Sequence, residues 1–134
     1  MRAILFTVIF ITISNFLYSQ TWIDCCWKRS ATGLEYKIEK KGKGKKLKQG
    51  DSVSIQWIWY ECETSEVIED SKAYNYEPRW AVGSGIFVKG FEEGFGKLKK
   101  QGKAFIRIPP RLAFGEDGVG GRKTFCYFIE ILPD

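Results

Sequence analysis

The sequence predicts an α+β protein in which an antiparallel sheet of about five strands wraps around one short α-helix. Five stretches have the alternating or β-branched and aromatic composition of strands, and short turn-like connections link several of them. A single stretch has the apolar spacing of an amphipathic helix. Strands joined by hairpins pair antiparallel, and a lone helix among them buries its apolar stripe against the sheet.

Each predicted strand has its own pattern. The strands are predicted at residues 33–40, 51–63, 79–85, 103–108 and 124–132. In the first, Leu34, Tyr36 and Ile38 alternate with charged residues, which is typical of a half-buried strand. The second is the longest and is rich in β-branched and aromatic residues. Residues 64–78 are polar and irregular, and favour a short strand followed by a loop.

The predicted helix covers residues 87–102. Phe91, Phe95 and Leu98 are spaced i, i+4 and i+7, so they form one apolar stripe. Two glutamates come early and lysines come late, which matches the helix macrodipole. Gly102 is a natural C-terminal stop. Two glycines inside the segment cost about 1 kcal/mol each relative to alanine, so close packing against the sheet must offset them.

Length and composition limit the class of protein. The 134 residues suffice for one compact domain, and 44% hydrophobic, 16% aromatic and 28% charged residues indicate a globular chain. Histidine is absent, which excludes imidazole catalysis and Cys/His metal sites. We expect no metal and no cofactor. The four cysteines suit an oxidising compartment without forming a dense disulfide framework.

The N-terminus has the pattern of an export signal. Met1 and Arg2 precede the apolar residues 3–17, a run too short for an ordinary membrane span, and Ser19 is a small residue at a suitable cleavage position. We therefore predict a signal peptide at 1–19, a short N-terminal segment at 20–33 and one domain at 34–134. The mature protein is expected in the periplasm, the cell envelope or the medium, without a stable membrane span. An uncleaved anchor is the alternative, and a lipoprotein signal is less well supported.

The positive charge of the chain is concentrated in residues 40–50. The formal net charge is +5, and six lysines fall within nine residues here. A surface that binds nucleic acid or another polyanion is one interpretation. A solvated glycine-rich turn between two strands is the other, and we favour it because no aromatic residue alternates with the lysines as a base-stacking surface requires.

A set of motifs resembles the FKBP-type peptidyl-prolyl isomerases. The matching stretches are "GDSVSIQW", "VIEDS", "VGSGIFVKGFEEGFGKLKKQGKAFIRIPPRLAFGEDGVG" and "FIEIL", which together span about residues 33–132. The long middle stretch is the specific one, because the family pattern there runs LGxGxVIxGxEEG, KxGxK and IPPxLAYG. The resemblance implies an antiparallel sheet curled over one helix, with an apolar pocket between the two.

The chemistry of prolyl isomerisation agrees with this composition. The peptide bond before proline must rotate over a barrier of roughly 18–20 kcal/mol that amide resonance sets. No bond breaks and no proton is transferred, so a catalyst can hold the twisted amide in a water-poor aromatic pocket. A chain that is rich in aromatic residues and lacks histidine suits such a reaction.

The resemblance places individual residues in the expected pocket. The catalytic group is Trp57, Glu69, Phe91, Phe114 and Tyr127, and the substrate-binding group is Ile68, Phe87, Val88 and Trp80. Phe91 takes the position of the floor aromatic, and the Val88 backbone N–H is expected to bind a substrate carbonyl. Phe114 follows the two prolines and is expected to form part of the wall. For each of these side chains, plain core packing is the alternative, and for the Phe114 loop a mere capping role.

Several residues depart from the family pattern. Phe114 lacks the hydroxyl of the usual tyrosine, a loss of about 1 kcal/mol per hydrogen bond that should weaken binding several-fold. Glu69 is one methylene longer than the usual aspartate, and Asp70 is an alternative carboxylate. Near Pro78 the usual aromatic is not evident, although Tyr76 is a candidate. The "GGRKTF" stretch lacks the IPP segment that usually precedes the last strand.

The resemblance to the family and the departures from its motif together suggest two alternative functions. The first is a peptidyl-prolyl isomerase (EC 5.2.1.8) that acts on proline-containing polypeptides and assists the folding of exported proteins, and the departures from the pattern leave room for reduced activity. The second is a binding module on the same scaffold that recognises an apolar or proline-containing segment of a partner. The family's macrolide inhibitors are a further class of ligand, and no nucleic acid is expected. Because Cys62 and Cys126 lie on strands that are neighbours in the family sheet, the resemblance also suggests a disulfide between them.

Overall fold

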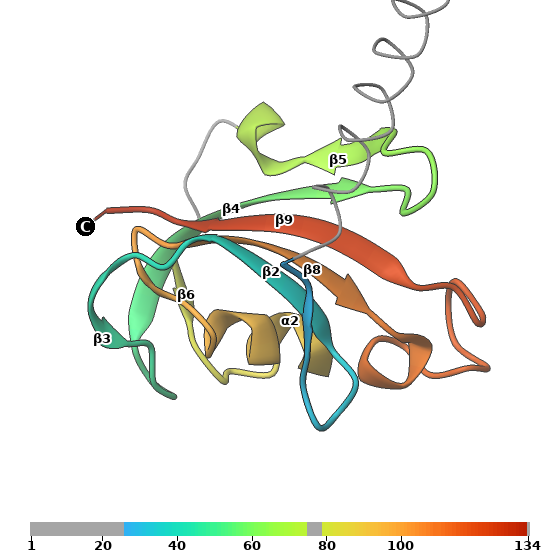
Figure 1. Ribbon diagram of the computed structural model, residues 1–134, viewed down its shortest axis with the longest axis horizontal. Helices are drawn as coiled ribbons and strands as arrows, with labels where there is room; N and C mark the ends of the chain where they lie inside the picture. Colours follow the sequence, from blue (N-terminus) through green and yellow to red (C-terminus); the bar gives the residue numbers. More distant parts are fainter. Residues whose placement is uncertain (1–25, 75–78, 134) are drawn as a thin grey trace, which may run out of the picture.

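The computed structural model describes residues 26–74 and 79–133, so the predicted signal peptide at 1–19 lies outside the described residues. The main sheet has seven strands in the order β1-β2-β8-β9-β4-β5, with β6 paired to β4, and a second sheet joins β3 to β7. The strands are β1 (Lys28–Arg29), β2 (Glu35–Lys40), β3 (Lys43–Lys46), β4 (Ser52–Tyr60), β5 (Val67–Asp70), β6 (Arg79–Ala81), β7 (Lys99–Lys100), β8 (Lys103–Ile108) and β9 (Phe125–Ile131). The helix α2 (Lys89–Phe95) lies under the concave face of this curved sheet (Figure 1).

The predicted fold class is confirmed, with more strands than the sequence indicated. Every strand pair is antiparallel. Alternation decides which side chains face the helix: along β8, Ala104, Ile106 and Ile108 are fully buried and the residues between them are not. Strands too short to show such alternation, β1 and β7 among them, were missed in the sequence.

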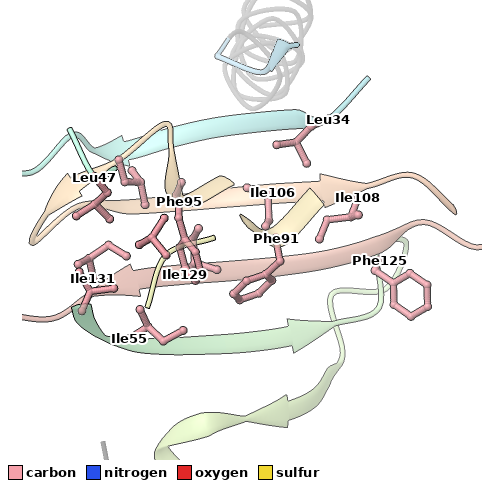
Figure 2. Packing of buried hydrophobic residues seen from close by; sticks show 14 residues of the cluster. Leu34, Leu47, Ile55, Phe91, Phe95, Ile106, Ile108, Phe125, Ile129 and Ile131 are labelled. Carbon is pink, nitrogen blue, oxygen red and sulfur yellow. The ribbon is translucent and has the colours of Figure 1, made fainter. Parts of the chain in front are cut away.

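The core lies between the helix and the sheet (Figure 2). Phe91 and Phe95 extend from α2 toward Ile106 and Ile129 of the sheet. A side chain on Gly90 would bring its Cβ to 2.4 Å from Ile108, and one on Gly94 to 3.2 Å from Ile106. The two glycines therefore allow the helix to approach the strands closely.

The helix is shorter than predicted. It ends at Phe95 with Gly96 as its C-cap, whereas the sequence predicted a helix to Gly102. The glycines that allow close packing are also poor helix formers, so the helix does not extend beyond its second turn. Leu98 is fully buried as expected, but from the segment after the helix. Because the helix ends early, the lysines that we expected in its last turn, where they would match the macrodipole, lie outside α2.

The lysine-rich segment is also more ordered than a simple turn. Residues 43–46 form β3, which pairs with β7. Leu47 anchors this small sheet: its side chain is buried and its N–H donates to the Leu98 carbonyl at 3.3 Å. Leu47, the one apolar residue among these lysines, is therefore part of the hydrophobic core.

The turn before β2 connects the N-terminal segment to the helix and to the 3₁₀ turn η2 (Pro110–Leu112). The Thr32 hydroxyl donates to Glu93 of α2 at 2.5 Å, and Arg111 of η2 donates to the Thr32 carbonyl. Leu34, just beyond this turn, is fully buried. The turn thus fixes the start of the loop that leads to Phe114.

These contacts make the stability sensitive to acid. Partial burial acts to raise the pKa of Glu93, but hydrogen bonds from Thr32 and Ser30 together with the charge of Lys97 outweigh it and lower the pKa below 4.5. A carboxyl group whose pKa is depressed on folding stabilises the protein above its unfolded pKa, and this contribution is lost as the pH falls through the folded value. Because the Glu93 side chain is still 23% exposed and therefore screened by solvent, we expect an effect of only about 0.5 kcal/mol. Urea unfolding of the wild type and Glu93→Gln should therefore differ at pH 6 and converge in acid; a constant difference would contradict the assignment.

The suggested disulfide is confirmed. Cys62, just after β4, is bonded to Cys126 at the start of β9, and their Cα atoms lie 5.3 Å apart. Within the described part of the chain, no helix is long and apolar enough to cross a membrane.

Candidate functional site

The predicted site residues gather in a cluster of aromatic rings between α2 and the concave face of the sheet. Phe91 is at its centre and is only 2% exposed. Its ring stacks on Phe87 at 4.5 Å between centroids, and meets Tyr127 of β9 edge-on at 5.1 Å. Phe95, one helical turn further on, closes the inner side at 5.1 Å from Phe91. Phe91, Phe87 and Tyr127, which the resemblance assigned to one site, are therefore in contact in the fold.

Phe87 links the floor to two tryptophans. Trp57 of β4 lies edge-on to it at 6.0 Å, and Trp80 of β6 at 4.8 Å. Both tryptophans are half-buried, so part of each ring faces solvent. The indole N–H of Trp80 is buried and has no acceptor among the described residues.

The loop that carries Phe87 is held by a glutamate that the sequence indicated only as a residue of the first helical turn. Glu92 of α2 accepts hydrogen bonds from the backbone N–H groups of Gly83 at 2.7 Å and Gly85 at 3.3 Å. Hydrogen bonds to a carboxylate are stronger than those between neutral groups. Glu92 therefore ties residues 83–87 to the helix and positions Phe87 over Phe91.

Trp59 was also missed, and it extends the cluster toward the loop after β8. It stacks on Tyr127 at 6.1 Å and lies 5.7 Å from Phe125, which in turn contacts Phe114 at 5.5 Å. Phe114 is thus joined to the floor by a chain of rings, although it is itself 52% exposed. Since side chains alternate along a strand, Trp59 shares a face with Trp57, and this signal was present in the sequence.

The carboxylate Glu69 lies on β5 opposite Trp59. It accepts a hydrogen bond from the hydroxyl of Tyr74 at 2.5 Å, a partner that the sequence did not suggest. The alternative carboxylate, Asp70, instead accepts from the Lys72 N–H and caps the short 3₁₀ turn η1 (Ser71–Ala73). Of the two, Glu69 is the acid whose charge acts on a ring of the cluster.

That ring is Tyr127. Burial, together with the negative charge of Glu69, raises the pKa of the Tyr127 hydroxyl to about 12. The hydroxyl is therefore a neutral hydrogen-bond donor throughout the physiological range.

A spectroscopic titration of the tyrosines checks this environment. In wild-type protein we expect one tyrosine to ionise near pH 12, and Tyr127→Phe should remove that step. Glu69→Gln should lower the pKa of Tyr127 but leave it above 10, because burial is the larger cause. A tyrosine whose pKa rises on folding stabilises the protein fully below pH 10 and loses this contribution as the pH passes the folded value. If Glu69→Gln leaves the high step unchanged, the charge of Glu69 does not reach the ring.

The remaining predicted residues lie at the edge of the cluster. Ile68 is 49% exposed on β5. Val88 is the N-cap of α2, and its carbonyl accepts from the N–H groups of Phe91 and Glu92 at 2.9 and 3.2 Å. Its own N–H precedes the hydrogen-bonded turns of the helix. Tyr76 lies outside the described residues.

The convex face of the sheet carries a separate group of rings. Trp27, Tyr60, Phe105 and Phe128 line a groove of about 590 Å³ there, and Arg107 covers the ring of Trp27 at 4.0 Å. Phe105 alternates with the buried residues of β8 and so faces away from α2. This groove is separated from the predicted site by the sheet.

Comparison with known proteins places this arrangement in a family. Residues 43–132 match the family model described as FKBP-type peptidyl-prolyl cis-trans isomerase, so the chain belongs to that family. The chain is 33% identical over 108 residues to the FKBP-type peptidyl-prolyl cis-trans isomerase FkpA of Escherichia coli, an alignment that covers 78% of this chain and 39% of the relative. It is 32% identical over 116 residues to FK506-binding protein 2 of Candida glabrata, covering 78% and 85%. The chain thus spans only about two fifths of the length of FkpA.

Solved structures agree. The crystal structure of FkpA from Escherichia coli superposes with a TM-score of 0.72 and 26% identity, covering 91% of this chain and 57% of that one. The crystal structure of AtFKBP13 has a TM-score of 0.69 at 23% identity, covering 80% and 97%, which shows the shared fold.

Proposed function

We propose that this protein catalyses the cis–trans isomerisation of X-Pro peptide bonds at the aromatic cluster. The observation that carries the proposal is the contact between Phe87, Phe91 and Tyr127, which come from separate elements of an FKBP-family fold. A prolyl ring bound against Phe91 would lose its water, and the adjoining amide would lose the hydration that favours its planar form.

Each residue has a proposed part in this reaction. Phe91 forms the floor beneath the prolyl ring once Phe87, whose ring stacks on it in the free protein, moves aside. Trp57 and Tyr127 flank this floor, while Ile68 and Phe114 contact the flanking residues of the peptide. The Val88 N–H, at the start of α2, donates to a substrate carbonyl. Trp80 supports Phe87 from the side.

The proposed part of Glu69 is electrostatic. Its carboxylate sits beside the carbonyl carbon of the twisting amide, which becomes more electron-poor as donation from the nitrogen is lost with the resonance. Its hydrogen bond from Tyr74 fixes its orientation.

A catalytically weak binding module is the second candidate. Two observations favour it: Glu69 is already engaged by Tyr74, and the exposed Phe114 has no hydroxyl to offer a ligand. Such a module would hold an apolar or proline-containing segment of a partner without accelerating rotation.

The cis-to-trans rate of a Phe-Pro or Leu-Pro test peptide, with and without the protein, decides between the two. Acceleration proportional to protein concentration supports the isomerase. A peptide that binds in a titration but rotates at its uncatalysed rate supports the binding module. If folded protein neither binds nor accelerates the peptide, both proposals fail.

We further propose that the protein is exported and acts on polypeptides that fold outside the cytoplasm. The disulfide between Cys62 and Cys126 supports this, because such bonds persist in oxidising compartments. Cell fractionation of the expressing organism tests the location, and thiol labelling without reductant tests the bond. Recovery in the cytoplasm with Cys62 and Cys126 reactive would contradict the proposal.

A further inference from the structure

The fold brings two lysine-rich segments of the sequence together. β3 pairs with β7 so that Lys43 lies opposite Lys100 and Lys46 opposite Lys99. Like charges directly opposite each other destabilise a strand pair, so this arrangement costs stability rather than adding to it. We call the resulting surface the lysine ribbon; it comprises Lys40, Lys41, Lys43, Lys45, Lys46, Lys48, Lys99 and Lys100.

The ribbon and the residues at its margin account for the net positive charge of the molecule. Residues 40–48 and 97–103 contain ten of the 21 basic residues and none of the 16 acidic ones, so the rest of the chain carries 11 basic and 16 acidic residues. Lys97 and Lys103, at the margin of these segments, are paired with Glu93 and Glu130. Except for the half-buried Lys99, every lysine of the ribbon is exposed. The protein is therefore strongly polarised, with a basic end on an otherwise acidic body.

The backbone holds this charge in a fixed place. The Lys99 N–H donates to the Lys41 carbonyl at 3.1 Å, and a Cβ at Gly42 would come within 2.3 Å of the Lys100 carbonyl oxygen. Leu47 ties the ribbon to the core. Figure 1 shows β3 at the end of the molecule opposite to the loop that precedes β9. The ribbon is therefore presented away from that loop on a rigid support.

We propose that the lysine ribbon docks the protein onto an anionic phospholipid surface. Eight lysines gathered on and beside this small two-stranded sheet match the size of clusters that bind acidic membranes. The residue type supports a diffuse anionic surface: all of these cations are lysines, which act as point charges, whereas arginine is preferred where phosphate groups are read bidentately. No aromatic residue occurs in 40–48 or 97–103, so the ribbon lacks the rings that bind bases of single-stranded nucleic acid.

Lysine footprinting on the full chain tests this docking. The protein is treated with an amine-acylating reagent alone, with phosphatidylcholine vesicles, and with vesicles that contain about 30 mol% phosphatidylglycerol. We expect acylation of Lys43, Lys45 and Lys46 to slow about five-fold with the anionic vesicles only, and to recover at about 0.5 M NaCl. The exposed Lys28, Lys72 and Lys123 serve as internal controls that should remain reactive.

Variants provide the matched comparison. Lys43→Gln/Lys45→Gln/Lys46→Gln should lose most of the salt-sensitive binding to anionic vesicles, whereas Lys28→Gln/Lys72→Gln/Lys123→Gln, with the same change in net charge, should keep it. The N-terminal apolar stretch is identical in all of these chains and cannot cause the difference. Equal loss in both variants, or equal protection of control and ribbon lysines, overturns the proposal. So does protection of the ribbon by single-stranded RNA but not by vesicles.

Discussion

Replacing Phe91 by alanine is expected to lower kcat/KM for a Phe-Pro test peptide by about 10- to 100-fold. Burial of an aromatic side chain is worth about 1.5–3 kcal/mol, and each 1.36 kcal/mol of lost transition-state stabilisation is a factor of ten in rate. If Phe91 forms the floor for the prolyl ring, truncation removes that contact and lets water enter. Its direct contacts with Phe87, Phe95 and Tyr127 mean that these rings also lose their common support.

The same substitution costs stability, so the experiment needs two further variants. Truncating a buried phenylalanine destabilises a protein by roughly 3–5 kcal/mol. Phe91→Leu retains most of the volume and should keep the protein folded, with a smaller loss of about ten-fold in kcat/KM because the ring contacts are gone. Phe105→Ala makes the same truncation on the convex face and should leave kcat/KM within about two-fold of wild type. Equal losses in folded Phe91→Leu and Phe105→Ala would show that the concave cluster is not the site.

The central strands could be predicted because their alternation is complete. Ala104, Ile106 and Ile108 alternate with half-buried residues. This two-residue period is the pattern expected of a strand that buries only one face. The end of the helix could not be predicted in the same way. Periodicity placed Leu98 on the apolar stripe, and it is indeed buried, but the local cost of glycine at 94 and 96 ends the helix at Phe95, about two turns before Gly102.

The candidate site was predicted through resemblance more than through residue patterns. The motif supplied Phe91, Tyr127 and Trp57; the fold brings Trp57 and Phe91 against Phe87, and Tyr127 against Phe91. It did not supply Tyr74, because that residue lies in an irregular segment where no period indicates which way a side chain points. The pairing of β3 with β7 was missed for a similar reason. Two lysines in a row carry no apolar pattern, so only tertiary contact reveals their partner strand.

The largest expected change in stability comes from the disulfide. Cys62 and Cys126 are 64 residues apart, and closing a loop of that length restricts the unfolded chain by about 4 kcal/mol in the chain-entropy description. We expect Cys62→Ala/Cys126→Ala to unfold at least about 15 °C below wild type, and reduced wild-type protein to behave in the same way. Cys26→Ala leaves the bond in place and should match wild type.

Below the melting temperature, loss of the disulfide should change the activity much less than it changes the stability. Tyr127 follows Cys126 directly, but it is also held by β9 pairing with Trp59 on one side and with Ile106 on the other. The ring therefore keeps its place without the covalent bond, and kcat/KM of the folded double variant should stay within about two-fold of wild type. A large loss of activity in protein that is still folded would mean that the bond, and not the strand register, positions Tyr127.

Domains of this size are stable by only about 5–15 kcal/mol, so losing about 4 kcal/mol would leave a reduced chain marginal at growth temperature. The disulfide therefore makes stability depend on the redox state of the compartment, and the thermal unfolding of reduced protein bears directly on where the protein can remain folded.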